Sequence, residues 1–272
     1  MRKALILGLA LVFVLGMSVG ASAWWQGQDW HIETGEYFGN VPYELQFSEG
    51  AEIIQRGDDD TAIINQDGLN RAHIGQGIDY QFNPPQTRAS SNNMAIIDQD
   101  GFLNEGEVNQ RGTENSADIE QYGDFNYAGI GQNGHDMTAD IYQNAVDSFV
   151  RASQFGGEGS VADITQFGDT NRIRTRQNGD FHDVTVVQEE GSFWNYTNVE
   201  QIGYGQTADV YQSGEQNANL VEQAGGGNWA KVSQIGEFNE ARVDQDGFGL
   251  NALIDQDGNG NYGEINQTGG GY

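Results

Sequence analysis

The fold of this chain is decided by a short motif that residues 228–247 carry twice in succession, NWAKVSQIGEFNEARVDQDG. In both copies an Asn is followed at every second position by Ala, Val and Gln, and a Gly stands two residues after the Gln. A period of two is typical of a β-strand, so these residues share one face and the variable residues between them share the other. The Gly adds the turn chemistry that ends the strand. The unit is therefore predicted to be a strand followed by a tight arc.

The motif recurs along most of the chain at a nearly constant interval. Its glutamines are Gln55, Gln66, Gln76, Gln99, Gln110, Gln121, Gln132, Gln143, Gln154, Gln166, Gln177, Gln188, Gln201, Gln212, Gln223, Gln234, Gln245, Gln256 and Gln267. Of the 18 steps between them, 14 are 11 residues long. The 23-residue step from Gln76 to Gln99 equals two periods plus one residue, and a degenerate copy with Pro84-Pro85 is expected there. This predicts about twenty half-repeats.

Short strands of this kind need a partner layer, because a strand of about five residues cannot bury its inner face alone. If successive half-repeats alternate between two sheets, each 22-residue strand-arc-strand pair forms one coil, and the coils stack at roughly 4.8 Å each. The predicted fold is all-β, a two-sheet parallel β-solenoid of about ten coils that spans residues 49–272.

Stacking places identical residues in columns along the axis. Columns of Gln and Asn inside the coil can hydrogen-bond to one another, which satisfies amides that are otherwise costly to bury. The predicted ladder contains every motif glutamine except Gln76, together with Asn126, Asn171, Asn195, Asn217, Asn228, Asn239 and Asn261.

The N-terminal region has a different composition from the repeats. Residues 1–23 combine two basic residues, an apolar run and a small-residue cleavage site, Ala21-Ser22-Ala23, which together predict a secretory signal peptide. Residues 24–48 are rich in Trp, Tyr and Phe and are expected to serve as an export signal or as a cap. No later segment resembles a transmembrane span, so the mature protein is expected to be exported without a membrane anchor.

Composition excludes several classes of function. The chain has 40 acidic and 12 basic residues, a net charge of −28 and no cysteine. Such acidity disfavours binding to nucleic acid or anionic membranes, and the lack of cysteine excludes disulfides and thiolate metal sites. The four histidines stand singly, and no catalytic motif or phosphate loop is present. We therefore predict a protein that is not an enzyme and has no catalytic residues and no bound cofactor.

The variable face differs between the two predicted sheets. One sheet carries Asp118, Asp140, Asp163 and Asp209 at equivalent outward positions, three residues before a motif glutamine. The other carries Arg151, Arg174 and Arg242. The aspartates are a candidate cation-binding column, with calcium as the candidate ion. The alternative is that these charges only keep the surface soluble and discourage edge pairing.

The 22-residue unit resembles the curlin repeat of curli amyloid subunits. The resemblance is carried by the pattern Q-x-G-x-x-N-x-A-x-x-x-Q, seen in residues 121–132, and it covers about residues 51–269. It implies a secreted subunit that polymerises outside the cell into adhesive biofilm-matrix amyloid fibres with a cross-β core. The implied partners are further copies of the chain, other curli-type subunits and an outer-membrane secretion apparatus.

The repeats run to within three residues of Tyr272, so no C-terminal cap is expected and the last coil presents an open edge that can template another chain. Two alternatives remain. One is a soluble acidic β-solenoid that acts as a surface adhesin or cation-binding protein. The other is an accessory subunit that nucleates a different fibre protein.

Overall fold

The computed structural model describes residues 50–56, 58–79, 86–87 and 90–270, and within these ranges all regular secondary structure is β-strand. The predicted signal peptide (1–23), the aromatic segment (24–48) and Pro84-Pro85 lie outside the described residues.

The strands form two long sheets, which we call sheet I and sheet II. Sheet I consists of β1 (Gly50–Gln55), β3 (Arg71–Gln76), β8 (Glu105–Thr113), β10 (Tyr127–His135), β12 (Phe149–Glu158), β14 (Arg172–Asp180), β16 (Tyr196–Tyr204), β18 (Ala218–Gly226), β20 (Glu240–Phe248) and β22 (Tyr262–Gly269), with the short β6 (Ser90–Ser91) beside β8. Sheet II consists of β2 (Thr61–Asp67), β7 (Met94–Phe102), β9 (Ser116–Asp124), β11 (Thr138–Val146), β13 (Val161–Asp169), β15 (Asp183–Gln188), β17 (Thr207–Glu215), β19 (Trp229–Glu237) and β21 (Asn251–Asp257).

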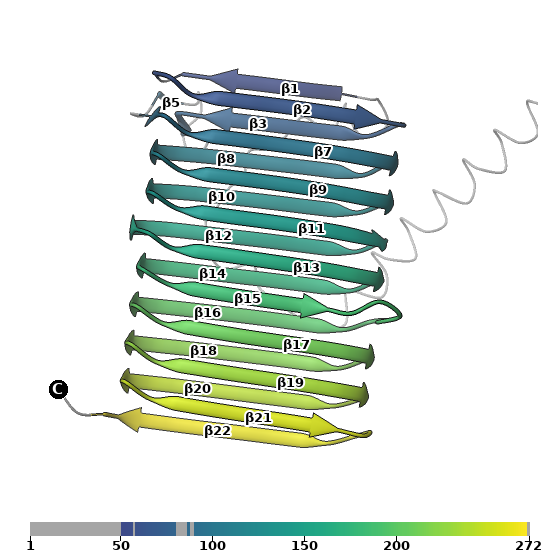
Figure 1. The fold of residues 1–272 in the computed structure, drawn as a ribbon, viewed down its shortest axis with the longest axis vertical. Helices are drawn as coiled ribbons and strands as arrows, with labels where there is room; N and C mark the ends of the chain where they lie inside the picture. Colours follow the sequence, from purple (N-terminus) through teal and green to yellow (C-terminus); the bar gives the residue numbers. More distant parts are fainter. Residues whose placement is uncertain (1–49, 57, 80–85, 88–89, 271–272) are drawn as a thin grey trace, which may run out of the picture. The chain divides into compact units, whose positions relative to one another are not determined.

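Consecutive repeat strands lie in opposite sheets, and the strands of the two sheets alternate along the solenoid axis from β1 to β22 (Figure 1). Within each sheet the pairing is parallel and in register, so that equivalent repeat positions face each other, as Gln132 faces Gln154 between β10 and β12. The predicted two-sheet parallel β-solenoid is confirmed. It has about nine turns, slightly fewer than expected.

The core lies between the sheets and is built from two small or branched residues per strand. In β9 these are Ala117 and Ile119, both fully buried, and the stacked positions of the neighbouring strands hold the same types, for example Ala139 and Ile141 in β11. Branched side chains fit the pleated surface of a strand, whereas alanine keeps the sheets close together. The narrow core explains how a chain with few large apolar residues folds.

The expected degenerate half-repeat between Gln76 and Gln99 does not occur in the ladders, so this prediction is wrong. Strand β2 pairs directly with β7, and β3 pairs directly with β8, which makes β3 and β7 consecutive half-repeats. The insertion includes an antiparallel pair of short strands outside the two main sheets, β4 (Ile78–Asp79) and β5 (Gln86–Thr87). Spacing alone suggested two periods because an insertion of about one period has the same length as a repeat.

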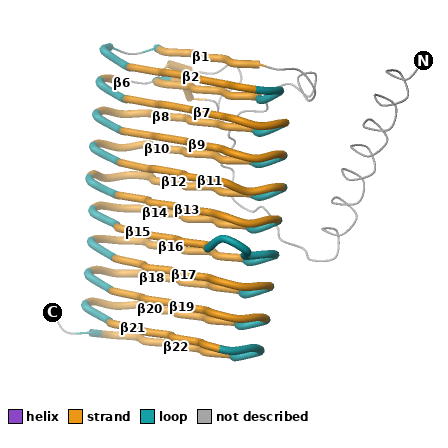
Figure 2. Tube along the Cα trace, turned by 45° about the vertical axis from the view of Figure 1, so that its right-hand side comes forward, coloured by secondary structure: helices purple, strands orange, loops and turns teal. Residues whose placement is uncertain are grey.

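The arcs at both edges depend on backbone with positive φ (Figure 2). In most coils a Gly stands two residues after the motif glutamine, and many of these glycines are stacked so closely that a side chain would collide with the next coil: a Cβ on Gly225 (φ 104°) would lie 2.0 Å from the carbonyl oxygen of Gly247. A second left-handed residue precedes the Asn position, and here non-glycine residues such as Phe125 (φ 60°) are accepted. Glycine is therefore favoured at the first position for two reasons, although Ala145 occupies it after Gln143, and the second position has only a backbone preference.

We expect Gly225→Ala to destabilise the solenoid by roughly 2–4 kcal/mol, because strain at a positive φ adds to the collision with Gly247. Gly227→Ala is the matched control. Gly227 also has a positive φ (63°), but no atom lies within 4 Å of its Cβ position. The control should cost only about 1–2 kcal/mol, from the left-handed backbone alone. Urea unfolding of both variants measures the difference, and equal losses would contradict the close-approach argument.

Candidate functional site

The motif glutamines form two continuous hydrogen-bonded ladders inside the solenoid. In sheet I each Nε2 donates to the Oε1 of the next glutamine over 2.8–3.3 Å, through Gln55, Gln76, Gln110, Gln132, Gln154, Gln177, Gln201, Gln223, Gln245 and Gln267. In sheet II the bonds measure 2.6–3.0 Å, through Gln66, Gln99, Gln121, Gln143, Gln166, Gln188, Gln212, Gln234 and Gln256. Gln76, which was left out of the predicted ladder, is therefore one of its members.

The ladders have a direction. In sheet I, and in sheet II from Gln143 onwards, each link is donated from the glutamine nearer the N-terminus to the glutamine nearer the C-terminus. In most sheet I glutamines the second Nε2 proton crosses the core to a backbone carbonyl of sheet II, as in the 2.8 Å bond from Gln132 to the oxygen of Ser116. One amide thus ties together two coils and two sheets, and both of its protons are used. A side chain of similar shape without an NH₂ group cannot replace it.

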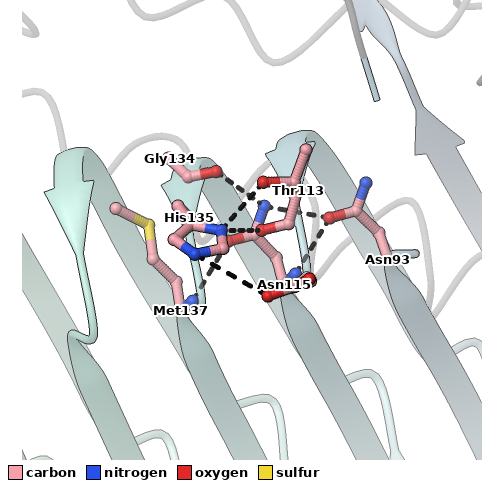
Figure 3. Close-up of polar contacts among 7 residues, drawn as sticks. Asn93, Thr113, Asn115, Gly134, His135 and Met137 are labelled. Atoms are coloured by element: carbon pink, nitrogen blue, oxygen red, sulfur yellow. Dashed lines mark hydrogen bonds and ion pairs between the residues drawn. The ribbon is translucent and has the colours of Figure 1, made fainter. Parts of the chain in front are cut away.

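The asparagines also connect successive coils, but through the backbone of the arcs. The Oδ1 of Asn195 accepts a hydrogen bond from the backbone N–H of Asn217 (2.8 Å), and its Nδ2 donates to the carbonyl of Gly214 (2.8 Å). Figure 3 shows the same arrangement for Asn115, which lies between Asn93 and Met137. The predicted members Asn126, Asn171, Asn195, Asn217, Asn228 and Asn239 are buried, whereas Asn261 is half-buried in the last coil.

Sequence reasoning missed other members of the asparagine columns. Asn70, Asn93, Asn104 and Asn115 occupy the same position in earlier coils. His182 replaces an asparagine, and its Nδ1 faces the backbone N–H of Gln206 at 3.4 Å. Burial lowers the pKa of His182, which favours the neutral ring that can accept this bond. The signal they share in the sequence is their position two residues before the first inner residue of the following strand.

The four predicted aspartates lie on the outer face of sheet II. Asp118, Asp140 and Asp163 are directly paired on successive strands, after which Thr185 interrupts the column before Asp209. Asp209 forms a 2.9 Å ion pair with Lys231 on the following strand. Burial, followed by neighbouring carboxylates, raises the pKa of both Asp118 and Asp140. The three adjacent aspartates are therefore placed close enough to repel one another.

These carboxylates form a line along the axis. Among the described residues, no three or more His, Asp or Glu side chains are grouped as a metal centre would require. Calcium binding by the column stays a prediction. No helix in the described part of the chain is long and apolar enough to cross a membrane.

The outer face of sheet I has a different charge pattern. Arg151 and Arg174 are paired on neighbouring strands, and Arg242 follows further along the sheet, where it contacts Glu222 at 3.3 Å. Arg176 likewise contacts Glu200 at 3.3 Å. Sheet I thus presents arginines, two of which contact glutamates, whereas sheet II presents the aspartate column. The two faces are chemically distinct although the inner faces are nearly identical.

Both ends of the described solenoid leave their inner faces open. Ile53 of β1 is 44% exposed, whereas Ile74, its partner in the next coil, is fully buried. At the other end a hollow is lined by residues of β21 and β22, including Ile254, Gln256 and Ile265. Each end thus presents an apolar and amide surface of the same pattern as the interior, beside unpaired strand edges.

The fold and its ladders define a β-solenoid repeat protein. Four segments match the family model of the curlin associated repeat, residues 91–123, 112–144, 207–236 and 239–269. The chain therefore carries curlin associated repeats in these segments. It matches no curated protein. The repeats and the solenoid together indicate a structural protein of the curli type.

Proposed function

We propose that this protein is a secreted structural subunit that polymerises end to end into extracellular curli-like amyloid fibres, which serve adhesion and the biofilm matrix. The observation that carries the proposal is the pair of end coils, whose inner faces are open among the described residues. Strand edges expose N–H and C=O groups that another strand can satisfy, and a solenoid stays monomeric only if such edges are covered. A second copy offers the same alternation of Ala, Ile and Gln in the same register.

The energetic gain from stacking comes from three sources. Docking would bury the exposed Ile53 and the hollow between β21 and β22, extend both backbone ladders, and add one amide link to each glutamine ladder. The main partner is another copy of this chain. Curli-type subunits and an outer-membrane secretion apparatus are the further partners that the family suggests, and the fibre would be located at the cell surface. No cofactor is needed.

Assembly of the purified mature protein tests the proposal. We expect thioflavin-positive fibres whose diffraction shows a meridional spacing of roughly 4.8 Å, and whose growth is accelerated by preformed fragments. Sonicated fragments that have been heat-denatured and dialysed are the control for seeding. A protein that remains a folded monomer for days at low micromolar concentration and high salt would contradict the proposal and favour a soluble adhesin.

The aspartate column supports a second, cation-dependent candidate function. A carboxyl group with a raised pKa holds its proton more tightly in the folded state than in the unfolded state. The destabilisation of the folded state by the ionised carboxylate is absent at pH values below the ordinary pKa of about 3.8. It grows as the pH rises from there through the raised pKa. Acidification towards pH 4 should therefore stabilise the solenoid at Asp118 and Asp140 and accelerate assembly. Millimolar calcium should act similarly at pH 7, and more strongly than sodium at equal ionic strength.

Replacing Asp118, Asp140, Asp163 and Asp209 together with Asn should accelerate assembly severalfold at pH 7 and remove the calcium-specific part of the response, because the repulsion within the column is gone. A matched variant makes the same charge change at exposed aspartates elsewhere, Asp58, Asp136, Asp169 and Asp255. Thioflavin kinetics in calcium and sodium compare the two. Cation capture is contradicted if the column variant keeps its full calcium response.

A further inference from the structure

We propose that successive copies in the fibre are related by a half-turn about the fibre axis, so that sheet I of one copy continues into sheet II of the next. The inference rests on the proposed end-to-end assembly and adds its geometry. It follows from the number of repeat strands. The described ladders contain ten strands on the main path of sheet I and nine in sheet II, nineteen in all. Because this number is odd, the two terminal strands, β1 and β22, belong to the same sheet.

Stacking two copies in the same orientation would leave a gap. Sheet I of the incoming copy would pair its β1 with β22, since both strands belong to that sheet. Strands of the two sheets alternate along the axis (Figure 1). The first strand position beyond β22 is therefore in sheet II, next to β21, and it lies nearer than the position that the incoming β1 would take in sheet I. None of the described strands would occupy it, because the incoming β2 lies a full coil further along. The facing edges of β21 and β2 would both remain unpaired inside the fibre, and buried backbone groups without partners are strongly unfavourable.

A half-turn removes this gap. The incoming β1 then pairs with β21, and the incoming β2 pairs with β22. Strand direction is preserved, because consecutive half-repeats within the chain run in opposite directions on opposite sheets and are themselves related by a half-turn and half a coil (Figure 1). The junction thus repeats the symmetry of the chain's interior. Extending the register pairs Ala51, Ile53 and Gln55 with Ala252, Ile254 and Gln256, which matches residue types at all three inner positions.

The direction of the amide ladders also agrees with this junction. The links at the C-terminal end of both ladders are donated towards that end, so the last glutamines, Gln256 and Gln267, each hold an axial proton without a glutamine acceptor beyond them. At the opposite end Gln55 and Gln66 accept from no earlier glutamine among the described residues. In the half-turn junction Gln256 faces Gln55, and Gln267 faces Gln66. Both ladders then continue across the boundary from donor to acceptor.

The arrangement determines how charge is displayed along the fibre. Each copy contributes nine and a half coils, or roughly 46 Å at 4.8 Å per coil. The aspartate column of sheet II would therefore change sides at each boundary and alternate with the arginine and glutamate face of sheet I. A fibre of copies in one orientation would instead carry all aspartate columns on a single side.

Site-specific labelling of fibres from the full mature chain tests the inference. The chain has no cysteine, so Asp140→Cys places a unique label on the outer face of sheet II. We expect maleimide-gold particles on alternating sides of single fibres at intervals of roughly 46 Å, and helical reconstruction of unlabelled fibres should give that rise with a rotation near a half-turn. Particles confined to one side, or a rotation near zero, would overturn the inference while leaving fibre formation intact. Absence of fibres would instead contradict the proposed function and the inference with it.

Deletion variants test the role of the odd number. Removing residues 228–238 deletes one half-repeat, whereas removing residues 228–249 deletes two and is the matched control. In the Asp140→Cys background, the first deletion should place all labels on one side, at intervals of roughly 43 Å. The second should retain the alternation, at roughly 41 Å. If the single deletion also alternates, the orientation of copies does not depend on strand number and the inference is wrong.

Discussion

Replacing Gln166 with glutamate should destabilise the solenoid by more than about 3 kcal/mol at pH 7. Gln166 is fully buried in the middle of sheet II, accepts from Gln143 at 2.7 Å and donates to Gln188 at 3.0 Å. A carboxylate keeps the acceptor but loses the donor, and it places an unpaired charge inside the core. Urea unfolding at pH 7 measures the loss of stability.

The pH dependence of this variant separates charge from shape. Burial should raise the pKa of the new carboxyl group, so the destabilisation should grow as the pH rises above about 4.3 and shrink below it, where the neutral acid can again donate one hydrogen bond. The matched control is Thr165→Glu, which adds a carboxylate to the half-buried outer face of the same strand. It should cost less than about 1 kcal/mol. Similar losses of stability in both variants would mean that the hydrogen bonds of the ladder contribute little beyond the packing of the glutamine side chains.

Gln256→Glu should slow fibre elongation at least about tenfold, the equivalent of roughly 1.4 kcal/mol at the growing end. Gln256 donates to the carbonyl of Glu240 at 3.0 Å and is the last glutamine in the sheet II ladder. A carboxylate there faces that carbonyl without a proton, and it offers no donor to the Oε1 of an incoming copy. The inner surface of the end coil would then repel the next subunit.

The comparison variant for elongation is Asp257→Asn, one residue away on the exposed side of the strand. It removes a charge instead of adding one and leaves the ladder unchanged, so elongation should stay within about twofold of wild type. Seeded thioflavin kinetics with wild-type fragments and variant monomers measure both rates. Equal slowing of the two variants would show that growth does not depend on the inner amide at this end.

The two ladders account for order in a chain whose composition is poor in large apolar residues. Each inner glutamine satisfies its own amide while it links coils, and the alanines let the sheets approach closely. The same repetition that stabilises the interior leaves both end coils unsatisfied. Stability of the coil and a tendency to stack are therefore two results of one pattern.

The sequence by itself determined the strand, the arc and the inner face, because each depends on local periodicity. Alternation of Ala, Ile or Val, and Gln at period two can bury only one face, and the 11-residue interval implies strands that stack in register. The same 11-residue interval also places the aspartates on the outer face of one sheet and the arginines on the outer face of the other. These features could be predicted without knowing which strands pair with each other.

Tertiary structure alone decided the features that depend on pairing between distant segments. The interval from Gln76 to Gln99 is compatible with either an extra half-repeat or an insertion, and only the direct pairing of β2 with β7 distinguishes them. That pairing brings Gln76 into the ladder and makes the number of repeat strands odd. The direction of the amide links is also set in three dimensions, because an amide has no preferred orientation until carbonyls of the facing sheet, such as that of Ser116, accept one of its two protons.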